Sequence, residues 1–255
     1  MVTPNSVLAK IERRVATLFN SRPFDCRPER PIVSITFDDF AKSAWEAAGP
    51  ILAAHDAHAS YYACGGLLGT EFDGILLANA DDVQAVAAAG HEIGCHTHRH
   101  VCLQGPSART LEEELDRNRE AMQALLPQQS LQTFAYPFGA TGIVGKRLTA
   151  RRFAAARGVW RGINQGKIDL MQLQTHSVPE VGKDAATARS MIEQLAATNG
   201  WLVLYTHDVA AQPSAGGCTP EQLATVLTAA RNGGCELLSV AEALTAVGAP
   251  GMVPA

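Results

Sequence analysis

Histidines are concentrated in one short stretch of this sequence. Residues 91–100 read HEIGCHTHRH and contain four of the eight histidines of the chain. His96 and His100 are four residues apart, a spacing that brings two side chains to one side of a helical turn. Two imidazoles placed in this way can share one metal ion, and Zn²⁺ commonly accepts imidazole nitrogens together with a carboxylate. If the stretch is extended instead, His96, His98 and His100 share one face, and a three-histidine site becomes possible.

Two acidic residues upstream can complete such a site. Asp38 and Asp39 directly follow the strand-like run 32–37, which reads IVSITF. Burying two adjacent carboxylates costs free energy unless a cation or hydrogen bonds compensate. One of them can bind a metal, and the other can act as a general base toward a water that the metal activates. The alternative interpretation is a helix N-cap, which commonly places an Asp directly after a strand.

A third apolar run ends at His207. The six residues before it, WLVLYT, are typical of a buried strand. A histidine at the mouth of a site can donate a proton to a departing amine. A histidine that packs against a backbone carbonyl is the structural alternative.

These three segments require a scaffold that gathers strand ends. Strand-like runs alternate with helical patterns about seven times along the chain, which predicts an α/β fold of parallel strands in a single domain. In such folds, functional side chains gather at the carboxyl ends of the strands. The pattern also predicts local elements, which are a helix over 6–19, a loop over 21–31, a helix over 107–126 capped by Thr110 and Glu113, a basic helix over 143–157 and a strand over 158–161.

The composition excludes several classes of protein. The 255 residues are 47% hydrophobic and 18% charged, which suits one large folded core. The net charge of −4, without a clustered basic face, argues against a nucleic-acid-binding protein. Six dispersed cysteines form no CxxC pair, the first 20 residues lack the apolar core of a signal peptide, and no run of 18 apolar residues occurs. We therefore expect a cytoplasmic protein with reduced, mostly buried thiols and no membrane span.

Four motifs taken together resemble the polysaccharide deacetylase family, which is carbohydrate esterase family 4. In chain order they are TFDD at 36–39, GHEIGCHTHRH at 90–100, FAYPFG at 134–139 and LVLYTHDV at 202–209. The resemblance covers roughly residues 30–245. It implies a distorted (β/α) barrel of about seven parallel strands at 31–245, after an N-terminal helix and loop at 1–30, in one domain over 1–255. It also implies a divalent metal, usually zinc, and hydrolysis of an N-acyl group from an amino sugar or a similar amide.

The resemblance also implies roles for individual residues. Asp38 is similar to the catalytic base of the family, and His207 is similar to its general acid. The backbone N–H of Phe138 resembles the donor that stabilises the oxyanion. The metal ligands implied in the same way are Asp39, His96 and His100.

The motifs depart from the family pattern at particular positions. Phe40 follows the aspartates where the family typically has Gly, which predicts a bulky ring near the base. Ala135 stands where the third motif usually carries an arginine that holds the base, and Arg161 is the predicted substitute. Asp169 is predicted to orient His207.

The sequence therefore predicts a metal-dependent hydrolase that removes an acetyl or formyl group from an amino-sugar substrate. Two alternatives remain open, namely an amidohydrolase of this fold acting on a small non-sugar amide and a carbohydrate-binding member without turnover. Phe40 and the missing arginine favour the alternatives, whereas the retention of all metal and proton-transfer residues favours an enzyme. An open cleft would indicate a polymeric substrate. The glycine-rich loop 64–74, which contains Phe72, is either a wall of that cleft or a plain connector.

Overall fold

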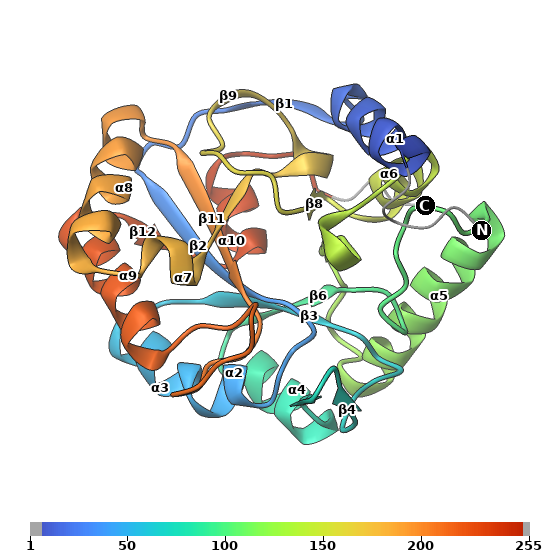
Figure 1. The fold of residues 1–255 in the computed structure, drawn as a ribbon, viewed down its shortest axis with the longest axis horizontal. Coiled ribbons are helices and arrows are strands. Elements are labelled where there is room, and N and C mark those ends of the chain that lie inside the picture. The colour runs from blue at the N-terminus through green and yellow to red at the C-terminus, as the bar shows by residue number, and fades with distance from the viewer. Residues whose placement is uncertain (1–6, 252–255) are drawn as a thin grey trace.

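The structure is a computed structural model that describes residues 7–251, and its centre is a sheet of parallel strands (Figure 1). The strand order is β10-β11-β2-β3-β6-β7-β8, and β12 also pairs with β2. Because all neighbours are parallel, the carboxyl ends of the strands meet at one side of the sheet. The strands are β2 (Ile32–Phe37), β3 (Ala59–Ala63), β6 (Glu92–Cys95), β7 (Thr133–Ala135), β8 (Ala155–Arg157), β10 (Thr175–Ser177), β11 (Trp201–Thr206) and β12 (Glu236–Leu237).

The sheet curls until its two edges nearly meet. Thr175 at the start of β10 donates a backbone hydrogen bond to Trp160, just after β8, at 2.6 Å, and Leu173 donates one to Ala156 at 2.9 Å. These isolated bonds replace a continuous ladder at the seam, so the barrel is distorted. The predicted α/β barrel of seven parallel strands in a single domain is confirmed.

Helices cover the outside of the barrel, and two small antiparallel sheets lie beside it (Figure 1). None of the helices within residues 7–251 combines the length and apolar character that crossing a membrane requires. The small sheets pair β1 (Pro23–Cys26) with β9 (Gly166–Asp169) and β4 (Glu71–Phe72) with β5 (Ile75–Leu76). The helices are α1 (Val7–Leu18), α2 (Ser43–Glu46), α3 (Ala48–Ala54), α4 (Ala80–Ala88), α5 (Ala108–Leu125), α6 (Ile143–Arg152), α7 (Val178–Val181), α8 (Ala185–Thr198), α9 (Pro220–Asn232) and α10 (Val240–Ala246).

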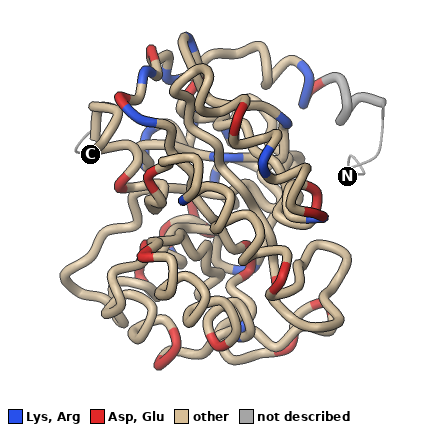
Figure 2. Tube along the Cα trace, turned by 90° about the vertical axis from the view of Figure 1, so that its left-hand side faces the viewer, with Lys and Arg blue, Asp and Glu red and all other residues tan. Residues whose placement is uncertain are grey.

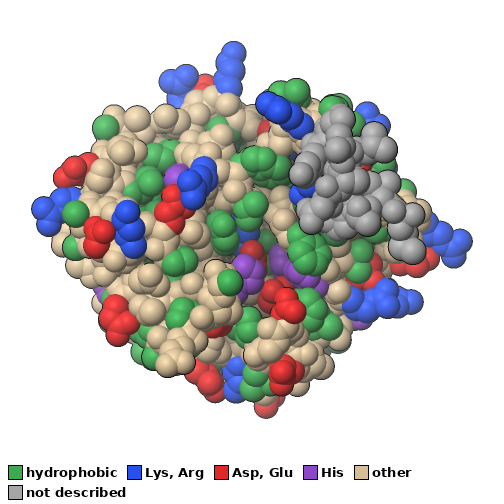
Figure 3. All heavy atoms as spheres, viewed as in Figure 1, with side chains coloured by type: hydrophobic (Ala, Val, Ile, Leu, Met, Phe, Trp, Pro, Cys, Tyr) green, Lys and Arg blue, Asp and Glu red, His purple; other side chains and the backbone are tan. Residues whose placement is uncertain are grey.

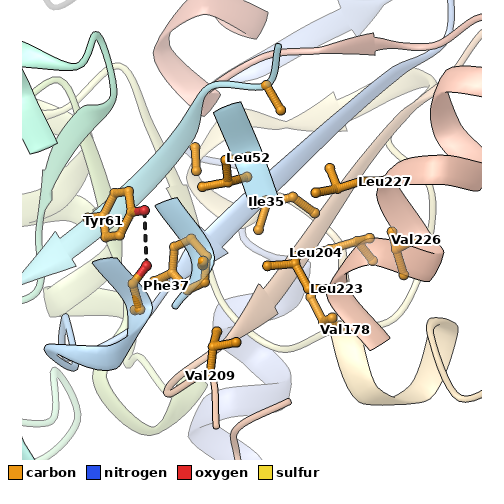
Figure 4. Packing of buried hydrophobic residues seen from close by; sticks show 14 of the residues in the cluster. Ile35, Phe37, Leu52, Tyr61, Val178, Leu204, Val209, Leu223, Val226 and Leu227 are labelled. Carbon is orange, nitrogen blue, oxygen red and sulfur yellow. Dashed lines mark hydrogen bonds between the residues drawn. The ribbon is translucent and has the colours of Figure 1, made fainter. Parts of the chain in front are cut away.

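The strands that carry the predicted site are fixed by the core. Every residue of β2 is buried, and alternate side chains of this strand, such as Ile35, pack outward against helices (Figure 4). Leu204 of β11 and Leu227 of α9 join the same cluster. The hydroxyl group of Tyr61 donates a hydrogen bond to the carbonyl of Ala44 at 3.1 Å, which ties β3 to α2. Burial of this apolar surface holds the ends of β2 and β11 side by side.

Several element limits differ from the sequence predictions. The helix predicted to reach residue 157 ends at Arg152, and β8 then occupies 155–157 instead of 158–161. Arg157 is therefore the residue at the carboxyl end of β8. The helix predicted over 107–126 begins with Ser107, whose side chain accepts from the Thr110 N–H at 3.2 Å, so the predicted Thr110 capping box is wrong. The loop predicted over 21–31 contains strand β1.

His91 lies at the amino end of β6, on the side of the barrel away from the carboxyl ends. Its Nδ1 accepts a hydrogen bond from the Ala59 N–H at 3.2 Å, so a neutral ring carries its proton on Nε2. The rings of His58 and Trp45 both stand edge-on at 5.8 Å. Burial, assisted by the proximity of His58, lowers the pKa of His91 to about 4.

Acid should destabilise the fold through His91. An unfolded histidine binds a proton near pH 6.5, whereas folded His91 does so only near pH 4. Between these values the unfolded state binds more protons, so stability falls as the pH falls. We expect the wild-type melting temperature to drop more steeply from pH 6.5 to pH 4 than that of His91→Asn, whose Oδ1 can accept the same hydrogen bond. Equal slopes for the two proteins would contradict this role of His91.

Candidate active site and its metal-binding residues

A cavity of about 350 Å³ opens at the carboxyl ends of the strands. Figure 3 shows it as a hollow near the centre of this face, where histidine and acidic side chains lie beside hydrophobic ones. Residues from the ends of β2, β6 and β11 line it together, as the positions of the motifs predict. They include Asp38, Asp39, His96, His100 and His207.

Three side chains in this cavity fit a metal ion. Oδ1 of Asp39 lies 3.5 Å from Nε2 of His96 and 3.4 Å from Nε2 of His100. One ligand atom from each residue lies within 4.8 Å of the others. Among the described residues, Oδ1 of Asp39 is one of a few buried side-chain atoms without a hydrogen-bond partner, a costly arrangement that a cation would relieve. Two imidazoles and one carboxylate are a donor set that suits Zn²⁺ and leaves coordination positions open.

The two histidines converge through an irregular turn. His96 follows β6, and its Nδ1 donates to the carbonyl of Ala135 at 2.8 Å, which leaves Nε2 free to bind a metal. Thr97 and His100 adopt positive φ angles of 63° and 55°, so residues 96–100 are neither helical nor extended. His98 lies against the backbone of Gly66 instead of facing His96 and His100. The three-histidine alternative is therefore excluded.

Neighbouring groups fix the conformation of this turn and the protonation state of His100. Glu114, buried on α5, accepts hydrogen bonds from the backbone N–H of Arg99 at 3.0 Å and from its Nε at 2.8 Å. This contact fixes the middle of the turn between the two histidines. Burial, together with the nearby His96, lowers the pKa of His100 to about 4. His100 is thus neutral near pH 7, the form that can bind a metal.

A buried arginine that the sequence interpretation missed holds Asp38. The guanidinium of Arg157 donates a short hydrogen bond from Nη2 to Oδ1 of Asp38, and it lies 4.8 Å from the ring centre of Tyr62 and 5.7 Å from that of Tyr205. Arg157 on β8 is the register partner of Ala135 on β7. The small side chain of Ala135 stands where the family motif has arginine. The guanidinium therefore reaches Asp38 from the neighbouring strand.

The charge on Asp38 results from opposing effects. Burial raises the pKa of this carboxyl. The positive charges of Arg157, His96 and His207 together lower the pKa by more than burial raises it, and the resulting pKa is about 2. Asp38 therefore remains ionised at any pH at which the protein would be assayed. It can accept a proton but has none of its own to give.

Two predicted catalytic residues lie elsewhere. Arg161 is exposed and pairs with Glu180 at 3.0 Å, so the prediction that it replaces the motif arginine is wrong. Asp169 ends β9, outside the barrel, where it accepts hydrogen bonds from the backbone N–H groups of Ser21 and Arg22 at 3.0 and 2.9 Å. The prediction that Asp169 orients His207 is also wrong, because strand β9 pairs with β1 instead of continuing the barrel.

His207 is oriented by the loop that follows it. Its Nδ1 donates to the carbonyl of Gly216 at 3.1 Å, and its backbone N–H donates to the same oxygen at 3.1 Å. The loop is closed by Asp208, whose carboxylate accepts from the Ser214 N–H at 3.0 Å. Nε2 of His207 consequently faces the cavity, 4.0 Å from Oδ2 of Asp39.

A methyl group at Gly216 should misplace His207. A Cβ atom built there would lie 2.3 Å from Nδ1 of His207, so the imidazole would have to move. Since a displacement of about 1 Å can cost roughly 10²-fold in rate, Gly216→Ala should lower turnover by about 10- to 100-fold and leave metal content unchanged. Gly251→Ala, which meets no atom within 4 Å, is the matched control. Wild-type turnover in Gly216→Ala would show that this contact does not position His207.

Phe40 does not narrow the cavity, contrary to the sequence prediction. Its side chain is fully buried, with its ring 4.8 Å from that of Tyr61 in the core. Phe40 follows Asp39 with a second positive φ angle, 55° after 59°, a conformation that glycine adopts more easily than other residues. The turn after β2 therefore keeps the backbone conformation that suits glycine and directs the larger side chain away from the site.

Two other aromatic rings do form the wall of the cavity. The ring centre of Phe72 lies 5.2 Å from that of His100, and the ring centre of Phe138 lies 4.5 Å from it on the rim. Loop 64–74 is thus a wall and not only a connector. Six of the eight non-glycine residues with positive φ in the described chain belong to this site or its turns, a clustering that is typical of functional sites. They are Asp39, Phe40, Asp73, Thr97, His100 and Phe138.

Comparison with known proteins identifies the family of the chain. A family model described as polysaccharide deacetylase matches residues 25–153. The chain belongs to the polysaccharide deacetylase family. No curated protein matches the sequence.

Solved structures of this family share the fold at low sequence identity. One is a family 4 acetyl xylan esterase from Clostridium thermocellum in complex with a cobalt ion, at 18% identity and a TM-score of 0.61, over 86% of this chain and 93% of that one. Another is the Xyl-CE4 domain of a xylanase from the hindgut metagenome of Trinervitermes trinervoides, at 17% identity and a TM-score of 0.62, over 88% and 95%. A third is a CE4 family pseudoenzyme from Bacillus anthracis, at 16% identity and a TM-score of 0.60, over 86% and 66%. Because a pseudoenzyme shares the fold, catalysis has to be inferred from the residues of the site.

Proposed function

We propose that this polysaccharide deacetylase family member is a metal-dependent hydrolase that removes an N-acyl group, acetyl or formyl, from an amino-sugar substrate. One observation carries the proposal. The three possible metal ligands lie in one cavity, between the ionised carboxylate of Asp38 and Nε2 of His207. A metal, a base and an acid around one cavity are the groups that amide hydrolysis requires.

The role proposed for Asp38 is to take a proton from the attacking water. Arg157 binds Oδ1 and so fixes the carboxylate. A base with a pKa of about 2 removes a proton from water effectively only if the pKa of that water is lowered too, which is the chemistry that a divalent metal held by Asp39, His96 and His100 supplies. Asp38 then holds the proton that the water has lost.

His207 is the proposed proton donor to the leaving amine, and Phe138 is the proposed hydrogen-bond donor to the oxyanion. His207 donates its Nε2 proton to the leaving amine, and the carbonyl of Gly216 accepts from Nδ1 and so stabilises the protonated ring before the transfer. The backbone N–H of Phe138, in the tight turn at 137–139, is the proposed donor to the oxyanion.

The shape of the site favours an oligomeric saccharide over a small amide. The cavity shares Phe138, Gly139 and Val159 with a second hollow of about 310 Å³, so the two hollows adjoin, and together they are called the groove. A groove of this kind extends past the reacting group and can accept a neighbouring sugar. The presence of both Asp38 and His207 favours turnover, because a binding module needs neither proton-transfer residue.

Release of acetate tests this proposal. Zinc-loaded protein is incubated with chitotetraose and with N-acetyl and N-formyl monosaccharides, and free acetate or formate is measured. We expect release that depends on the metal and is greater for the oligomer. Stoichiometric metal without release from any saccharide, together with hydrolysis of a small ureide or amide, would contradict an amino-sugar substrate.

A further inference from the structure

The second hollow lies across Phe138 from the metal-binding residues. Phe138 is 68% exposed and stands between the two parts of the groove. Beyond it, the walls come from the rim after β8 and from helix α1, which does not belong to the barrel. The lining residues are Arg13, Arg14, Thr17, Phe138, Gly139, Val159 and Trp160.

Helix α1 is held against the barrel by specific contacts. Lys146, buried on α6, donates from Nζ to the carbonyl of Ala16 at 2.9 Å and pairs with Asp169 at 2.7 Å. Arg147 lies over the ring of Phe19 at 5.0 Å. The side chain that was predicted to orient His207, Asp169, thus helps to anchor the segment that carries the arginines. These contacts give the arginines a defined place beside the groove.

The two halves of the groove are lined by different charged side chains. Asp38, Asp39 and Asp73 line the catalytic half, and Asp73 stands at the tip of the tight β4–β5 hairpin. Arg13 and Arg14 line the other half. Figure 2 shows that most Lys and Arg positions lie in the upper half of the molecule, the half that contains α1 and α6 in Figure 1. Arg14, whose side chain is exposed, would attract an anionic group to the second hollow.

The floor of the second hollow suits a sugar ring. Trp160 and Val159 contribute apolar surface, and Val159 is 43% exposed. An aromatic ring offers a wide, rigid surface for packing, while a guanidinium can bind a carboxylate or a phosphate with two parallel hydrogen bonds. The apolar surface of Val159 and Trp160 and the positive charge of Arg14 together suit a sugar unit that carries an anionic group.

We propose that the second hollow binds an anionic group, a carboxylate or a phosphate, on the unit next to the N-acyl amino sugar. This inference rests on the proposed hydrolysis, because it takes the amino sugar to lie at the metal-binding residues. Arg14 is the main contact of the anion, and Trp160 packs against the unit that bears it. Contact of the anion with Arg14 sets the direction in which the saccharide lies in the groove.

Binding to an inactive protein tests the inference separately from catalysis. Zinc-loaded Asp38→Asn protein is titrated with three probes, at low and at high salt. Chitotetraose is neutral, a tetrasaccharide of alternating glucuronic acid and N-acetylglucosamine carries carboxylates, and UDP-N-acetylglucosamine carries phosphates. We expect at least one anionic probe to bind roughly tenfold more tightly than chitotetraose at low salt, and this ratio should shrink as salt rises. The anionic probe that gains affinity identifies the carboxylate or the phosphate as the ligand.

Arg14→Ala, introduced into the same protein, should lower the ratio of anionic to neutral affinity about fivefold or more. Arg189→Ala is the control, because it removes one exposed positive charge from α8, on the opposite side of the barrel from α1, and it should keep the ratio (Figure 1). Equal affinity for all three probes, or an unchanged ratio in Arg14→Ala, would overturn the inference. Failure of wild-type protein to release acetate from any probe would instead count against the proposed function, and the binding ratios would still decide the anion site.

Discussion

Asp38→Asn protein should bind one metal ion like the wild type and yet hydrolyse its substrate about 10³-fold more slowly. General base catalysis contributes roughly 10²- to 10⁴-fold, and an amide in place of the carboxylate cannot accept the proton of water. Asn has nearly the shape of Asp, and its carbonyl oxygen can still accept the hydrogen bond from Arg157. The expected loss is therefore in turnover more than in folding.

The measurement is turnover under saturating substrate, with metal content determined on the same sample. Asp25→Asn is a suitable control, because Asp25 is an exposed carboxylate whose partner is Arg27. Unchanged turnover in metal-loaded Asp38→Asn protein would show that Asp38 is not the base.

Loss of Arg157 should damage both stability and activity. The side chain is 1% exposed, and its removal leaves the buried carboxylate of Asp38 without its main partner. Breaking a buried ion pair in this way typically costs about 3–5 kcal/mol of unfolding free energy. We expect Arg157→Met to lower the melting temperature clearly and to reduce turnover by roughly 10²-fold, because Asp38, the proposed base, is then no longer fixed. Denaturant unfolding and steady-state kinetics measure the two effects.

The register of β7 and β8 provides a rescue experiment. Ala135 and Arg157 are partners on neighbouring strands, so an arginine at 135 starts close to the position that residue 157 occupies. The double variant Ala135→Arg/Arg157→Ala should recover part of the stability and turnover that Arg157→Ala loses. Ala150→Arg combined with Arg157→Ala is the control, since residue 150 lies on α6 and not in the sheet. If the double variant were no more stable and no more active than Arg157→Ala, an arginine at 135 could not take the place of Arg157, and the prediction would be wrong.

The sequence was sufficient to predict the barrel and most of the site. Alternating strand and helix patterns require parallel strands, and parallel strands bring residues that follow them to one edge. This reasoning needs no knowledge of which strand pairs with which. It placed Asp38, Asp39, His96, His100 and His207 in one cavity, where the structure has them.

The remaining features depend on contacts between distant segments. Arg157 faces Asp38 only because β8 ends at residue 157 and pairs in register with β7, and neither fact follows from local pattern. Asp169 was misassigned because β9 turns away from the barrel and pairs with β1, where Asp169 is the register partner of Pro23. Pairing between such distant segments is not visible in the local sequence. Phe40 was expected in the cavity because it directly follows the two aspartates. Its positive φ turns the ring into the core instead, and a single sequence does not reveal that backbone conformation.

The second hollow could not be anticipated for the same reason. Helix α1 was predicted from its apolar spacing, but its docking on α6 depends on the buried Lys146 and its contacts with Ala16 and Asp169. Only this docking brings Arg13 and Arg14 to the groove. A charge pattern that looks like a solvated helix face in the sequence thus becomes one side of a binding surface.

Titration of metal-free protein with Zn²⁺, followed by calorimetry, tests the metal site most directly. We expect the wild type to bind one equivalent, with an affinity that falls as the pH is lowered, because the ligands must be deprotonated to bind. His100→Ala and Asp39→Ala should each lose this binding, whereas His98→Ala, which alters a histidine outside the site, should keep it. A wild-type protein that takes up no equivalent of zinc, or a His100→Ala protein that binds it equally well, would contradict the assignment of Asp39, His96 and His100 as metal ligands.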